Sequence, residues 1–147
     1  MKTLLLILLM IQSNFIHAHD GGHGPSLKDE SLQGGKISAI IKASEVKIGR
    51  KAKMLYKAEL VHDSRNTKVK LYIYDSNMKP LNLKDFSKTI NAIQIEGRKV
   101  SKFTLKLDKS GTYFIGERPK NKRVPFNIDI KFSKENQQLF GAFDGLD

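Results

Sequence analysis

Histidines near the beginning of the chain are the residues whose type and spacing best suit chemistry. His19, Asp20 and His23 lie close together in a glycine-rich segment. If the chain is cleaved after Ala18, His19 becomes the first residue, and its α-amine and imidazole can chelate one metal ion. Nitrogen donors assisted by a carboxylate bind Cu(II) most tightly, and bind Ni(II) and Zn(II) more weakly. We therefore predict that His19, Asp20 and His23 bind Cu(II) or another divalent metal, and we predict no other cofactor.

The alternative interpretation is a polar arm without a ligand, because short histidine-rich tracts are only compositional evidence. His62 is the only histidine beyond this arm, and we expect it to be a surface residue at the end of a strand. The sequence contains no cysteine. This excludes disulfide bonds, thiolate metal sites and a cysteine nucleophile.

Basic residues are the second feature that suits binding, since the formal net charge is +11. Arg118, Lys120, Lys122 and Arg123 crowd one turn, and a second cluster lies within residues 47–53. Such loops can contact anionic surfaces such as lipid head groups. The alternative is that these side chains are solvated and keep sheet edges unpaired.

The sequence does not predict an enzyme. It has no nucleophile-elbow pattern, no phosphate loop and no dinucleotide-binding fingerprint. Its Asp and Glu residues are scattered along the sequence, so no pair that could act as general acid and general base can be identified. We therefore expect a binding protein without catalytic residues. A copper oxidase built on His19 is a remote alternative.

The first 18 residues are typical of a secretory signal peptide. Lys2 precedes an apolar run over residues 4–11, and the segment ends on the small residue Ala18. That run gives roughly 12 Å of helix, against about 30 Å of bilayer hydrocarbon. We expect a periplasmic or secreted protein with no transmembrane segment and no nucleic-acid partner.

The remaining chain divides into an arm, a domain and a C-terminal segment. Glycine and proline over residues 19–35 indicate a flexible arm. Apolar and polar residues then alternate in short runs separated by turn residues, which is typical of strands with one buried face. We predict an all-β fold, a single antiparallel β-sandwich of about seven strands, immunoglobulin-like, over residues 36–133. Residues 134–147 are expected to be an edge strand or a tail.

Two strand regions carry more detailed predictions. Over residues 69–75, Val69, Leu71 and Ile73 are expected to face the core, while Tyr72 and Tyr74 face solvent. Over residues 83–93 a helical face competes with a strand. The β-branched residues from 89 onward favour a short turn at residues 83–87 followed by a strand.

Several motifs together resemble a known class of domain. The order AHDGGHGP, LYIYDSNMKPLNL, KFTLKLDKSGTY and VPFNIDIKF is similar to small periplasmic β-sandwich domains. These occur alone or near the N-terminus of periplasmic adaptor proteins of heavy-metal efflux pumps, and the resemblance covers roughly residues 34–132. It implies an efflux or envelope protein as partner, with His19, Asp20 and His23 as metal contacts. Copper-resistance sandwich proteins that begin with a mature histidine are a looser resemblance.

We therefore expect an exported accessory of copper or divalent heavy-metal homeostasis or efflux. The alternative is a structural or interaction module of the envelope that binds no metal. Such a module would contact a protein or an anionic surface through a sheet edge or the basic loops. The sequence indicates no particular oligomeric state.

Overall fold

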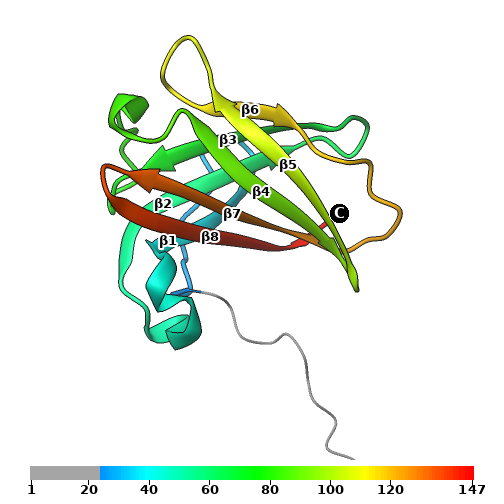
Figure 1. Cartoon of the computed structure of the whole chain (residues 1–147), viewed down its shortest axis with the longest axis horizontal. Coiled ribbons are helices and arrows are strands. Elements are labelled where there is room, and N and C mark those ends of the chain that lie inside the picture. The colour runs from blue at the N-terminus through cyan, green and yellow to red at the C-terminus, as the bar shows by residue number, and fades with distance from the viewer. Residues whose placement is uncertain (1–23) are drawn as a thin grey trace, which may run out of the picture.

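The computed structural model describes residues 24–147, which form eight strands and two short 3-10 helices (Figure 1). The strands are β1 (Lys36–Lys42), β2 (Met54–His62), β3 (Lys68–Tyr74), β4 (Thr89–Glu96), β5 (Lys99–Leu107), β6 (Phe114–Glu117), β7 (Phe126–Lys134) and β8 (Gln137–Leu146). The helices are η1 (Ala43–Lys51) and η2 (Leu83–Asp85). No helix in residues 24–147 has the length and apolar character needed to cross a membrane.

The strands close into an antiparallel barrel in the order β1-β2-β3-β6-β5-β4-β7-β8. The predicted all-β, antiparallel class is confirmed. The predicted immunoglobulin-like sandwich of about seven strands is not what the pairing shows, because β8 pairs with both β7 and β1. Residues 134–147, expected as an edge strand or a tail, thus supply the strand that joins the two ends of the sheet.

Gly141 lies at this closure. It pairs with Ile40 of β1 on one side and with Ile130 of β7 on the other. A Cβ at this position would collide with the Ile40 side chain and crowd that of Ile130. Glycine therefore lets the last strand approach both neighbours closely.

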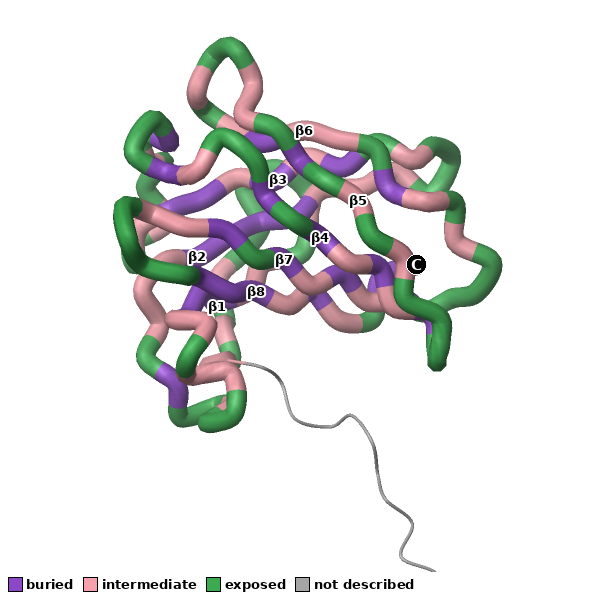
Figure 2. Tube along the Cα trace, in the orientation of Figure 1, coloured by how far each residue is buried: buried purple, intermediate pink, exposed green. Residues whose placement is uncertain are grey.

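The barrel interior is filled by the alternating apolar residues of its strands. Val69, Leu71 and Ile73 are buried as predicted. Figure 2 shows buried and more accessible residues alternating along the strands, with exposed residues gathered at the turns. Fully burying such a side chain stabilises the fold by about 1.5–3 kcal/mol. Phe126, Ile128, Ile130 and Phe132 of β7 belong to the same core.

A smaller apolar cluster lies outside the barrel. The register of β1 shifts between Ile40 and Ile41, so these neighbours are both buried, but in different clusters. Ile41 packs with Ala52 and Phe140, and Val46 of η1 packs against this cluster. The 3-10 helix therefore covers part of the outer face of β1 and β8.

The region between β3 and β4 follows the prediction of a turn and then a strand. In η2, the side chain of Asn82 accepts a hydrogen bond of 3.1 Å from the backbone N–H of Lys84. Leu83 is fully buried, and β4 starts at Thr89. The β-branched residues prevail over the helical spacing because they pair with β5 and β7 on both sides.

The segment before β1 is tied to the barrel by one buried carboxylate. Glu59 of β2 accepts hydrogen bonds from the backbone N–H groups of Leu32, Gln33 and Gly35 and from the Ser31 hydroxyl. The hydroxyl of Tyr74 donates to the same carboxylate at 3.2 Å. Tyr74 is therefore buried, and the prediction that it faces solvent was wrong.

Candidate functional site

Segments far apart in the sequence meet at one end of the barrel, on the right in Figure 1. The β1–β2 pairing places the start of β1 beside the end of β2, and the β3–β6 pairing places the start of β3 beside the end of β6. The end of β8, the start of β7 and the β4–β5 turn also lie at this end of the barrel, because Phe126 pairs with Leu146 and Ile95 pairs with Asn127. We call it the His62 end.

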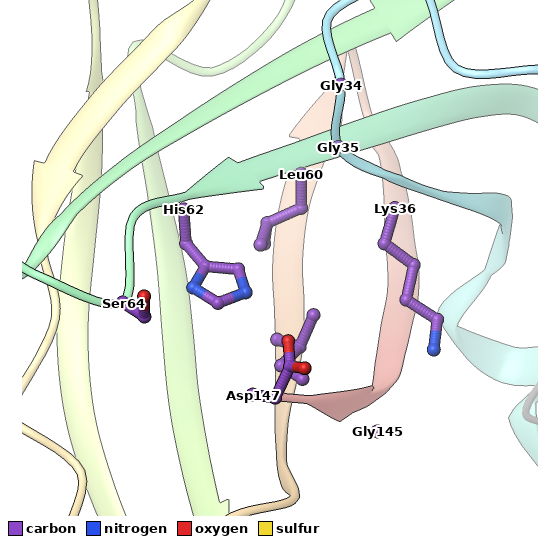
Figure 3. Close-up of a pocket in the computed structure, with 9 residues that line it drawn as sticks. Gly34, Gly35, Lys36, Leu60, His62, Ser64, Gly145 and Asp147 are labelled. Carbon is purple, nitrogen blue, oxygen red and sulfur yellow. The ribbon is translucent and has the colours of Figure 1, made fainter.

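His62 is the last residue of β2 and borders a hollow of about 440 Å³ at this end. The polar walls of the hollow include Lys36, Ser64 and Asp147, and Leu60 also lines it. Figure 3 shows the imidazole of His62 and the carboxylate of Asp147 both directed into this space. The expected surface histidine is in fact half-buried, and its Nδ1 atom is buried without a hydrogen-bond partner in the described structure.

The surroundings of His62 favour its neutral form. Burial lowers the pKa of the imidazole, and the positive charge of Arg118 lowers it further. The carboxylates of Asp147 and Asp63 act in the opposite direction, but the net pKa lies below the ordinary value. The ring also packs edge-on against Phe126, with the ring centroids 5.6 Å apart. His62 is thus a neutral, half-buried polar group beside a buried cation.

Arg118 is that cation, and its position corrects the expectation of a surface contact. Only 4% of the residue is exposed, and its guanidinium carbon lies 4.7 Å from the centroid of the Phe126 ring. Its Nη1 atom donates to the side chains of Gln94 and Asn121 and to the carbonyl of Pro119. Its Nε atom is buried and has no partner among the described residues.

The buried carboxylate of Glu96 shapes the loop that follows Arg118. Glu96 accepts hydrogen bonds from the backbone N–H groups of Lys122 and Arg123 at 2.7 and 3.2 Å. These bonds, with one from the Gln94 amide, lower the pKa of Glu96 against the effect of burial. Gln94 thereby links Glu96 to Arg118, and the loop is held on the end of β4.

This arrangement brings two basic segments together. The β4–β5 turn begins at Gly97, whose φ of 61° suits glycine, and a Cβ at Gly97 would lie 3.7 Å from the Arg123 guanidinium. Residues 97–100 and 119–125 contain five basic residues and no acidic residue. We call these segments the basic tip. Its exposed members are Arg98, Lys99, Lys120, Lys122 and Arg123, together with Val100 and Val124, which are 55% and 62% exposed.

The opposite end of the barrel has a hollow of about 590 Å³, bordered by Tyr56 and Lys134. Tyr56 and Phe86 meet edge-on at 5.5 Å, and Phe86 also packs against Phe132. Lys134 covers this aromatic group and donates to the Tyr56 hydroxyl at 3.3 Å. Because these polar atoms have partners, the His62 end is the better candidate for a ligand.

The predicted metal ligands His19, Asp20 and His23 lie outside the described residues. The first described residue, Gly24, lies against Ala39 and Ile41 of β1, and not beside His62. Residues 24–147 hold no group of three or more His, Cys, Asp or Glu side chains arranged to bind a metal ion. The Cu(II) site therefore stays a prediction from the sequence.

No protein-family model, curated protein or solved structure matches this chain. The resemblance to efflux adaptor domains stays a prediction as well. Sequence reasoning missed the packing of His62 and Arg118 on Phe126, since His62 is more than 50 positions from the other two residues along the chain. The alternation of Phe126 with polar neighbours showed only that its ring would face inward.

Proposed function

We propose that this chain is an exported, non-catalytic binding protein of the cell envelope that docks on anionic lipid head groups through the basic tip. The observation that carries the proposal is the contact between the β4–β5 turn and residues 119–125. It gathers five exposed cations, while the neighbouring carboxylate of Glu96 is buried and accepts hydrogen bonds from the backbone of Lys122 and Arg123. Export is predicted from the leader sequence. Docking through basic loops is the alternative function, which requires no metal.

Charge and apolar exposure both support a lipid surface as the partner. Each Lys or Arg near an anionic membrane contributes about 1 kcal/mol of attraction. Val100 and Val124 add exposed apolar side chains to the same tip, and such groups gain free energy on leaving water. An acidic protein would match the charge equally well, and it becomes one outcome of the test.

The test is co-sedimentation with vesicles of phosphatidylglycerol and phosphatidylcholine in varied proportion. The variant Lys99→Gln/Lys122→Gln/Arg123→Gln removes three charges from the tip. We expect it to lower affinity for anionic vesicles by up to about a hundredfold, from about 3 kcal/mol of lost attraction. The matched control is Lys84→Gln/Lys88→Gln/Lys109→Gln, which removes three exposed charges from the other end of the barrel.

The proposal requires binding that rises with phosphatidylglycerol content and falls with salt. It also requires the tip variant to bind less than the control variant. Equal loss in the two variants would show attraction by net charge alone and would overturn the role of the tip. Failure of the native protein to bind anionic vesicles would overturn docking on lipid and leave an acidic protein as the partner to seek.

Binding of Cu(II) or another divalent metal through His19, Asp20 and His23 is a separate proposal, supported by the sequence alone. It concerns the segment before the barrel and does not compete with the basic tip for residues. The two activities are compatible with one accessory protein of metal homeostasis or efflux.

A further inference from the structure

A second hollow lies beside the first, between the β2–β3 turn and the start of the loop after β6. Its volume is about 340 Å³, within the size range of small-ligand sites. Ser64 lines both hollows. The charged side chains of the second are Arg65, Arg118 and Lys120, and its other walls are uncharged polar residues. Among the described residues, no carboxylate lines it.

Arg118 supplies the strongest indication that a ligand belongs here. A buried cation is costly unless an anion or several hydrogen bonds compensate it. The Nη1 atom of Arg118 is fully engaged, yet within residues 24–147 the guanidinium makes no ion pair, and its buried Nε atom has no acceptor. An anionic group in the hollow would offset the positive charge of this guanidinium, which lines the hollow.

The balance of charge indicates the class of anion. Arg65 is already paired with Asp63, because its Nε and Nη2 atoms each lie 3.1 Å from a carboxylate oxygen. Arg118 and Lys120 then remain as two positive charges on the walls without an ion pair, although the more distant carboxylate of Glu96 partly offsets the charge of Arg118. A phosphate monoester carries about −1.5 to −2 at neutral pH and offers three acceptor oxygens. The hydroxyls of Ser64 and Thr67 are further donors on the walls.

We infer that this hollow binds the phosphate monoester group of a small ligand, with Arg118 and Lys120 as its cationic contacts. The hollow shares Lys120 and Asn121 with the segments of the basic tip, but its other lining residues lie outside the tip, and a soluble phosphate tests it directly. The inference therefore does not rest on docking to membranes. The ligand is either a free or soluble phosphate compound or a monoester lipid head group, since all present the same chemistry.

His62 provides an internal reporter for binding. Arg118 lowers the pKa of its imidazole, while Asp147 and Asp63 raise it, and Lys36 faces it across the first hollow. An anion bound to Arg118 offsets the positive charge that His62 senses. The pKa of His62 should therefore rise when the second hollow is occupied.

The experiment is an NMR titration of the whole protein at constant ionic strength, following the Arg118 Nε–H and His62 imidazole signals. The probes are inorganic phosphate, glycerol 3-phosphate and phosphatidate vesicles, with chloride as the control anion. We expect saturable shifts with at least one phosphate probe and an upward shift of the His62 pKa on saturation. Which probe saturates identifies free phosphate, a soluble ester or a lipid head group as the source.

Two exposed lysines of the same loop make a matched pair of variants. Lys120 lines the hollow, whereas Lys122 does not, and each change to glutamine removes one charge. Lys120→Gln should weaken phosphate binding about tenfold, and Lys122→Gln less than twofold. These variants avoid Arg118, whose replacement is liable to unfold the loop.

The absence of saturation with every phosphate probe would overturn the inference. Equal effects of the two lysine variants, or the same shifts with chloride, would overturn it too. The vesicle experiment on the basic tip uses the phosphodiester lipid phosphatidylglycerol. Failure there, with saturation by inorganic phosphate here, would reject membrane docking and keep the phosphate site.

Discussion

The Oε1 atom of Glu59 accepts a hydrogen bond of 2.8 Å from the backbone N–H of Gly35, a residue 24 positions earlier in the chain. Burial raises the pKa of this carboxyl, but hydrogen bonds from Ser31, Gly35, Gln33 and Leu32 together bring the pKa below its ordinary value. Glu59 is thus ionised at neutral pH. It fixes residues 31–35 against β2, beside the first hollow at the His62 end.

Replacing Glu59 with glutamine should destabilise the fold by about 3 kcal/mol. The amide keeps one acceptor oxygen, but its NH₂ group faces backbone N–H donors, which leaves buried donors unpaired. Urea unfolding measures the loss, and limited proteolysis before β1 shows whether residues 31–35 have been released. Glu30→Gln is the matched control, because Glu30 is exposed. A Glu59→Gln protein as stable as this control would contradict the anchoring role.

The same carboxyl predicts the response of the fold to acid. Since its pKa is lowered in the folded state, the stabilisation is complete above the ordinary value of 4.5 and is lost as pH falls through the lowered value. Thermal melting from pH 7 to pH 3 should therefore bring the native protein and Glu59→Gln closer in stability toward acid pH. A constant difference across that range would count against the hydrogen-bonded carboxylate.

Gly35 should tolerate no side chain. A Cβ on Gly35 would collide with the backbone carbonyl of Leu60 and with the Val61 side chain. Because backbone cannot move aside cheaply, Gly35→Ala should cost about 2 kcal/mol. Gly24→Ala is the control, since a Cβ there makes only ordinary contacts of 3.5 Å or more. Equal unfolding midpoints for the two variants would show that β1 and β2 separate more easily than the structure indicates.

His62 should make the fold less stable in mild acid. Its lowered pKa means that the unfolded chain takes up a proton near the ordinary value of 6.5 while the folded chain does not. Stability should therefore fall as pH drops from 6.5 toward the lowered pKa. In His62→Gln this contribution is absent, so its unfolding free energy should vary less between pH 8 and pH 5. Both proteins keep His19 and His23, and the difference between them isolates His62.

The strands were predictable from local alternation, whereas the closure of the barrel was not. A sandwich and a barrel both bury every second residue of β3 and β7, so periodicity does not distinguish them. The decision depends on β8 pairing with β1, nearly 100 residues away. Residues 139–147 alternate poorly, since Leu139, Phe140 and Gly141 are all buried in succession. These successive residues are all buried because both faces of β8 are covered, Leu139 in the barrel core and Phe140 in the smaller outer cluster.

The site was less predictable than the fold because it depends on burial of polar residues. Arg118 looks like its exposed neighbours Lys120 and Lys122 in the sequence, and nothing local marks it as interior. Its burial follows from stacking on Phe126 and from the hydrogen bond to Gln94. In the same way, Tyr74 faces away from the barrel core, as the alternation predicts, but it is buried beside Glu59, to which its hydroxyl donates, and Glu59 is covered by the segment before β1.

The metal prediction concerns a free histidine at the beginning of the exported chain. Intact mass measurement of protein recovered from the envelope should give His19 as the first residue. Cu(II) titration of that protein should then show one strong site, which His19→Ala abolishes and His23→Ala weakens. A free α-amine, with a pKa of about 8, and an imidazole near 6.5 must both lose protons to bind metal.

Affinity for Cu(II) should therefore fall steeply below neutral pH. His62→Gln is the matched control, because it removes a histidine while leaving residues 19–23 intact. Loss of Cu(II) binding in this control would relocate the site to the barrel end. An affinity no better than that of an unrelated protein with a free amine would reject the metal function, while the barrel, its basic tip and the phosphate hollow would stand on their own tests.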